Sequence, residues 1–138
     1  MNSRTCFLID DDPDDREIFK IALEDVSPHH KLISVFDCMT ALEKFAKEPG
    51  FLPDYIFLDL NMPSMTGQQC LPELKKMAHL EKIPIIIYST SSNETDFRST
   101  KKLGANHFLV KPSSISTLVK MLQWIMQEKT LPFLLATE

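Results

Sequence analysis

Five side chains with carboxylate, hydroxyl or amine groups stand at the ends of apolar runs that have the length of a strand. They are Asp10, Asp11, Asp59, Ser89 and Lys111. Aspartate is depleted in strands and costly to desolvate without a partner, so a carboxylate at the tip of a buried strand has little structural use. Alone, Asp59 fits a turn aspartate as well as a functional group. Its interpretation therefore depends on the other strand ends.

Held close together, these groups are suited to phosphoryl transfer. Three neighbouring carboxylates repel one another unless a cation lies between them, and oxygen ligands with room for water suit Mg²⁺. The Lys111 amine and the Ser89 hydroxyl can contact phosphoryl oxygens, and a carboxylate can be the nucleophile that becomes an aspartyl-phosphate. Asp59 is the predicted nucleophile because it stands alone on a central strand, whereas Asp10 and Asp11 are adjacent and suit metal binding.

The elements that must position these groups are five strands alternating with five helices. The predicted strands cover residues 5–9, 32–36, 55–59, 84–88 and 107–110. The predicted helices cover residues 13–26, 40–48, 67–77, 94–103 and 115–127. Capping side chains and first-turn acids mark several helix starts. Pro72 lies inside the third helical pattern, where it should remove a backbone hydrogen bond or kink the helix.

This alternation predicts an α/β fold of three layers, with a five-stranded parallel sheet and right-handed crossovers. All strands of such a sheet point the same way, so their carboxyl ends share one edge, where ligands bind. We therefore expect the five side chains, scattered in the sequence, to form one cluster.

Several charged or polar residues also have a purely structural interpretation. Helix capping accounts for Asp12, Asp14 and Asp15. The Ser89 hydroxyl fits a local cap as well as a phosphoryl contact. Lys111 precedes Pro112, and a cis bond there would aim the lysine inward.

Length, charge and cysteine usage limit the classes of function. A chain of 138 residues fits one domain, predicted over residues 1–130, with a short apolar tail over 131–138. The net charge of −4 argues against nucleic acid or an anionic membrane as the main partner. The three cysteines, Cys6, Cys38 and Cys70, are far apart and predict reduced thiols. With no apolar signal region or membrane-spanning run, the chain is predicted to be cytoplasmic.

The strand-end motifs resemble the receiver domain of bacterial two-component response regulators. The similarity covers nearly the whole chain, in the order and spacing of that family. It is carried by residues 7–11, by residues 56–63 with Gly67, by residues 84–89, and by residues 104–112. The resemblance implies a flavodoxin-like receiver fold with sheet order 2-1-3-4-5, and a signalling domain rather than an enzyme. The stand-alone receivers, among them those paired with phytochrome kinases, are the most similar in organisation.

The resemblance also assigns roles to residues. It implies that Asp59 accepts a phosphoryl group from a histidine kinase or histidine phosphotransfer protein. Asp11 would bind Mg²⁺ or Mn²⁺ directly, assisted by Asp10, with Asp59 and the Asn61 backbone carbonyl as further ligands. Ser89 and Lys111 would contact the phosphoryl group, and Phe108 would act with Ser89 as the aromatic switch.

Two other functions remain to be weighed. A haloacid-dehalogenase-type aspartyl phosphatase also uses a strand-end aspartate and Mg²⁺, but it needs a second aspartate two residues later as acid and base. Asn61 holds that position and cannot transfer the proton. An adaptor with an inactive site is disfavoured because all five strand-end residues are present.

The last helix suggests where a partner binds. An apolar stripe runs along it, and Trp124 falls roughly opposite. Trp124 either lies against the tail or a neighbouring loop, or joins an exposed surface for a partner or a homodimer through helix five and the tail. The downstream protein stays unidentified.

Overall fold

The computed structural model describes residues 3–136, which fold around one parallel sheet. Its strands are β1 (Thr5–Ile9), β2 (Lys31–Val35), β3 (Tyr55–Leu58), β4 (Ile85–Ser89), β5 (His107–Val110) and β6 (Leu134–Leu135). Their order is β2-β1-β3-β4-β5-β6, and every neighbouring pair is parallel. The predicted order 2-1-3-4-5 is confirmed, and the tail adds a short sixth strand beside β5.

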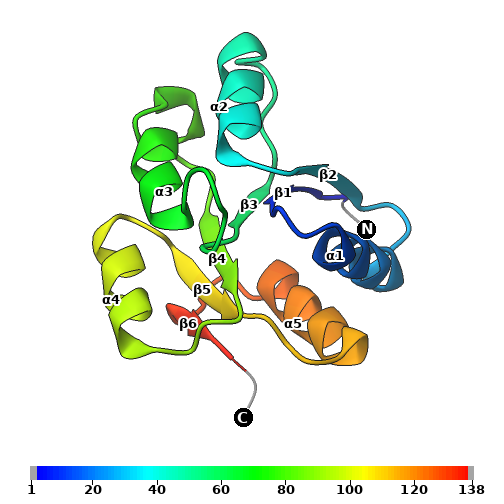
Figure 1. Cartoon of the computed structure of the whole chain (residues 1–138). Coiled ribbons are helices and arrows are strands. Elements are labelled where there is room, and N and C mark those ends of the chain that lie inside the picture. The colour runs from blue at the N-terminus through cyan, green and yellow to red at the C-terminus, as the bar shows by residue number, and fades with distance from the viewer. Residues whose placement is uncertain (1–2, 137–138) are drawn as a thin grey trace.

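Helices cover both faces of the sheet and complete the predicted three layers (Figure 1). Helices α1 (Pro13–Val26) and α5 (Ile115–Gln127) pack on one face. Helices α2 (Cys38–Lys47), α3 (Gly67–Lys75) and α4 (Glu94–Lys102), with the short 3-10 helix η1 (Ala78–Leu80), pack on the other. No helix described between residues 3 and 136 is long and apolar enough to cross a membrane.

Each α-helix begins at a polar side chain that accepts a hydrogen bond from a backbone N–H of its first turn. These caps are Asp12, Asp37, Thr66, Asn93 and Ser114. Such a cap satisfies backbone donors that the helix itself leaves unpaired. Pro72 lies inside α3, as predicted.

The buried face of α1 contains only some of the apolar residues of the helix. Phe19, Ala22 and Leu23 are buried, whereas Ile18 and Ile21 are 37% and 45% exposed. Phe19, Ala22 and Leu23 are three and one residues apart, so they form one helical stripe. The sequence contains enough apolar residues for two overlapping stripes, and packing against the sheet and α5 selects one of them.

The prediction of three reduced thiols is wrong for two cysteines. Cys38, the first residue of α2, and Cys70, in α3, form a disulfide whose Cα atoms are 5.9 Å apart. Neighbouring helices on the same face bring them together across a sequence separation of 32 residues, which no local spacing reveals. Cys6 lies on β1 and remains a buried free thiol. Burial, followed by the charge of Asp54, raises the pKa of Cys6 to about 12.

A cis bond between Lys111 and Pro112 is also not found, because every described peptide bond is trans. The Lys111 N–H donates to the Ser89 carbonyl oxygen at 2.8 Å, which continues the pairing of β5 with β4. Ordinary strand alternation therefore suffices to direct the lysine side chain.

The tail runs beside β5 and packs into the core. Leu135 is fully buried and pairs with Leu109, while Phe133 accepts a hydrogen bond from the Phe108 N–H. Trp124 is half-buried and packs against the same core as Leu131. Trp124 therefore contacts the body of the domain and also keeps part of its side chain at the surface.

Candidate functional site

Strand alternation sorts the strand-end side chains onto two faces of the sheet. The residues two positions before Asp10, Asp59 and Lys111 belong to the core beneath α1 and α5. Because side chains two positions apart on a strand share a face, these three point toward the α1 side. By the same count, Ser89 and Phe108 belong to the face covered by α2, α3 and α4.

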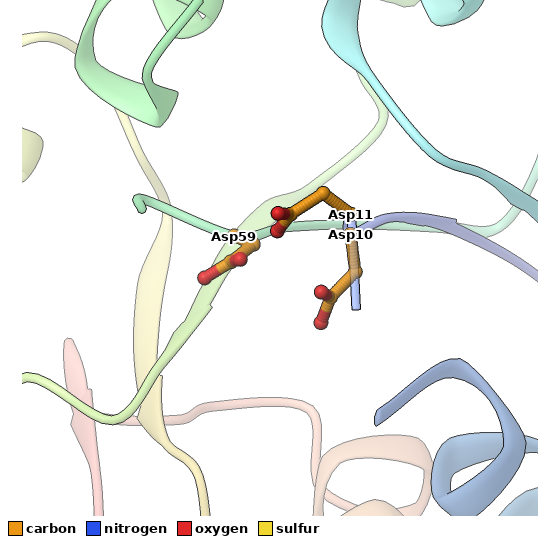
Figure 2. Close-up of side chains that lie close together, drawn as sticks. All are labelled: Asp10, Asp11 and Asp59. Carbon is orange, nitrogen blue, oxygen red and sulfur yellow. The ribbon is translucent and has the colours of Figure 1, made fainter. Parts of the chain in front are cut away.

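Three carboxylates meet at the carboxyl edge of β1 and β3. Asp10, Asp11 and Asp59 each offer an oxygen, and these oxygens all lie within 4.8 Å of one another. Figure 2 shows Asp10 and Asp11 leaving the end of one strand and Asp59 leaving its neighbour. Asp10 and Asp59 are buried, and Asp11 is partly exposed. An oxygen-rich cluster with an open side fits a hard divalent cation that keeps some of its water.

Lys111 supplies the positive charge of this cluster. Its Nζ lies 2.7 Å from Asp15 Oδ2, 3.0 Å from Asp10 Oδ2 and 3.7 Å from Asp59 Oδ1. It also lies 5.0 Å above the Tyr88 ring. The lysine side chain is only 9% exposed, so these charges interact with little screening by water.

Burial raises the pKa values of two carboxyl groups of the site, whereas neighbouring carboxylates outweigh burial at Lys111. It raises the pKa of Asp59 to about 6, with the Lys111 charge opposing the shift and the Asp10 and Asp11 charges adding to it. The pKa of Asp10 is raised by burial too, although the Asp12 N–H and Lys111 favour its charged form. For Lys111, burial would lower the pKa, but Asp15, Asp10 and Asp59 together raise it above its ordinary value. The pKa values of Asp10 and Asp59 are thus raised in a cluster of three carboxyl groups. Such a raised pKa is expected at a cation site, because a bound cation would stabilise the charged carboxylates.

The loop after β3 is held close to the strand end. The Gly67 N–H donates to the Leu60 carbonyl oxygen at 2.9 Å, and a Cβ at position 67 would lie 2.5 Å from the Asp59 carbonyl oxygen. Only glycine permits this approach. The Asn61 N–H lies 3.5 Å from Asp59 Oδ1, so the peptide at the predicted metal-ligand position adjoins the phosphoacceptor candidate.

Ser89 and Phe108 are placed near the edge but make other contacts. The Ser89 hydroxyl oxygen accepts a hydrogen bond from the Ser91 N–H at 3.2 Å, which is the local-cap arrangement. Phe108 is fully buried, and its ring packs edge-on against Phe97 of α4 at 4.8 Å between centroids. The structure therefore brings together Asp10, Asp11, Asp59 and Lys111, with Ser89 and Phe108 on the opposite face.

Asp15 is the residue of this site that the sequence did not reveal. It stands at the third position of α1, where an acidic side chain often turns back to the N–H of the capping residue. Here the Asp12 N–H is already donated to Asp10 Oδ1 at 3.0 Å, so the Asp15 carboxylate is free to bind Lys111. The sequence did contain one indication of this arrangement. Asp10 precedes Asp12 by two residues, a spacing that allows the Asp10 carboxylate to accept a hydrogen bond from the Asp12 N–H.

Comparisons with known proteins agree with this architecture. The family model of the response regulator receiver domain matches residues 6–123. Response regulator Rcp1 of Synechocystis sp. is 31% identical over 127 residues, or 88% of this chain and 86% of Rcp1. The phosphorylated cyanobacterial phytochrome response regulator RcpA has a TM-score of 0.80 at 28% identity, covering 95% of this chain and 99% of its own.

A further solved structure of a similar protein is a metal-bound form. The Mn²⁺-bound form of response regulator Rcp1 has a TM-score of 0.78 at 30% identity, covering 94% of this chain and 99% of its own. The sheet order, the carboxylate cluster and these matches define a receiver-type signalling domain. This chain belongs to the response regulator receiver family.

Proposed function

We propose that this protein is a single-domain response regulator whose phosphoacceptor is Asp59. The observation that carries the proposal is the meeting of Asp59 with two further carboxylates and with Lys111 Nζ at one strand edge. The donor is a histidine kinase or a histidine phosphotransfer protein. A phytochrome-type kinase is supported by the likeness to RcpA, which is a phytochrome response regulator.

The reaction transfers one phosphoryl group. A carboxylate oxygen of Asp59 attacks the phosphorus of phosphohistidine in line, so that an O–P bond forms as the N–P bond breaks. The imidazole nitrogen keeps the electron pair and takes a proton from solvent. Lys111 stabilises the negative charge that spreads over the transferring oxygens, and Ser89, after turning from its local hydrogen bond, donates to one of them.

The carboxylate cluster fits Mg²⁺ or Mn²⁺, since oxygen ligands and raised carboxyl pKa values both favour binding of a hard cation. Asp11, Asp10, Asp59 and the Asn61 backbone carbonyl would hold it. When bound, the cation supplies positive charge that offsets repulsion between the carboxylates and the incoming phosphoryl group.

The output we propose is a change in protein binding, with Ser89 and Phe108 as the switch residues. The Phe108 ring packs against Phe97, so a shift of the ring would reach α4, and the Phe108 backbone N–H donates to the Phe133 carbonyl oxygen of the tail. Helix α5 with the tail is the proposed homodimer surface. The setting is the cytoplasm, and neither nucleic acid nor a membrane is a proposed partner.

Phosphorylation by a small donor tests the assignment. Incubation with acetyl phosphate and Mg²⁺, followed by intact-mass measurement, is expected to give a single phosphate adduct. The adduct should be absent from Asp59→Asn and absent when EDTA replaces Mg²⁺. Asp25→Asn, which removes an exposed carboxylate of α1, is the matched control and should be phosphorylated like the wild type.

Two results would contradict the proposal. One is an adduct that persists in Asp59→Asn. The other is catalytic turnover of phosphate esters without an adduct, which would indicate a phosphatase.

A further inference from the structure

The contacts of Lys111 differ in length in a way that bears on catalysis. Asp15 makes the shortest of its three ion pairs, at 2.7 Å, whereas Asp59 lies at 3.7 Å, beyond hydrogen-bond distance. An ammonium group has three N–H donors, and two of them are donated to Asp15 and Asp10. The lysine is therefore held nearer to α1 than to the phosphoacceptor.

Asp15 differs from the other two carboxylates in its position. It comes from the first turn of α1 rather than from a strand end, and its side chain is 29% exposed while that of Asp10 is fully buried. If Lys111 moves away from Asp15, water can hydrate the Asp15 carboxylate. Breaking the Lys111–Asp15 ion pair therefore costs less free energy than breaking the Lys111–Asp10 ion pair. Asp15 is thus the partner that Lys111 can exchange for a phosphoryl oxygen.

We infer that Asp15 is a positioning residue that restrains Lys111 away from Asp59 and so slows phosphorylation. Lys111 must give up its bond to Asp15 to approach the charge that develops on the phosphoryl oxygens. Removing the Asp15 charge lets the lysine move toward Asp59 in advance. This inference rests on the proposed function, because it concerns the rate of phosphorylation of Asp59.

The test compares phosphorylation rates over a range of acetyl phosphate concentrations. Asp15→Asn is expected to raise the maximal rate constant about two- to fivefold, the size expected for releasing one partly exposed ion pair. Asp14→Asn is the matched control, since it removes the same charge from the same helical turn and Asp14 makes no ion pair with Lys111 among the described residues. It should leave the maximal rate constant unchanged. Asp15→Glu should return the rate toward that of the wild type.

The effect must also depend on the lysine. In a Lys111→Met background, Asp15→Asn should change the rate by less than about twofold, because the two residues act through one contact. An equal acceleration in that background would overturn the inference, as would equal effects of Asp15→Asn and Asp14→Asn. A slower Asp15→Asn variant would overturn it too. If wild-type Asp59 takes up no phosphate at all, it is the proposed function that fails.

Discussion

At the scale of single residues, Asp59 is a carboxyl group that the fold keeps in an unfavourable environment. Its pKa rises from 3.8 to about 6, mainly because it is buried, even though Lys111 lies nearby. Between these values the folded protein binds more protons than the unfolded chain. The free energy of unfolding therefore contains a favourable contribution from protonated Asp59. This contribution is fully present below about pH 4 and is lost as the pH rises through about 6.

This shift predicts that Asp59→Asn stabilises the metal-free protein. In EDTA at pH 7.5 the variant should exceed the wild type in free energy of unfolding by about 1–3 kcal/mol, since one pKa unit corresponds to roughly 1.4 kcal/mol. The difference should shrink to nearly nothing at pH 4. Urea unfolding across this pH range measures it, with Asp25→Asn as the control. A difference that stays constant with pH would show that burial does not perturb this carboxyl.

The sequence allowed a site residue to be predicted when its position follows from the parallel arrangement of the strands alone. Asp10, Asp11, Asp59 and Lys111 could be placed together because parallel strands end at one edge. Asp15 could not, because its contact depends on where the backbone N–H of Asp12 is donated. The trans geometry before Pro112 was likewise decided by strand pairing, which the sequence around the proline does not display.

At the scale of elements, residues 134–135 of the tail form a strand of the sheet, paired with β5. β6 contains only Leu134 and Leu135, yet Leu135 is fully buried while Leu134 is 39% exposed. A two-residue strand is too short to show alternation in the sequence, and this is why only an apolar tail was expected. The five longer strands were predictable because each forms a continuous apolar run.

This difference between two adjacent leucines gives a matched prediction. Leu135→Ala should lower the free energy of unfolding by about 2–4 kcal/mol, because it leaves a cavity beside Leu109 in the core. Leu134→Ala should cost less than about 1 kcal/mol, since that side chain is partly solvated. Thermal or urea unfolding compares the two variants. Equal costs would mean that β6 does not dock as described.

At the scale of the whole molecule, one covalent link joins two of the helices on one face of the sheet. The Cys38–Cys70 bond closes a loop that includes β3 and Asp59. A cross-link of this span restricts the unfolded chain far more than the folded one and stabilises by roughly 3–4 kcal/mol in the loop-entropy model. The spacing of three cysteines gave no sign of it, because pairing is set by helix packing.

Reduction is therefore expected to lower the melting temperature of the wild type. A strong thiol reductant should decrease Tm by roughly 10 °C or more, as a loss of about 3 kcal/mol implies for a domain of this size. The double variant Cys38→Ala/Cys70→Ala should have a low Tm that the reductant does not change further. Cys6→Ala serves as the control, since Cys6 is free in the structure and its variant should still respond to reductant. A wild type indifferent to reductant would mean that the bond does not form.

The same link has a consequence for the connectivity of the chain. Residues 48–50, which follow α2, are exposed, and a Cβ added at Gly50 would meet no atom within 4 Å. A protease that cut once in this segment would separate the chain into two pieces, with β1 and the Asp10–Asp11 pair on one and Asp59 on the other. Because the cut lies inside the closed loop, the disulfide would keep the two halves of the carboxylate cluster in a single covalent molecule.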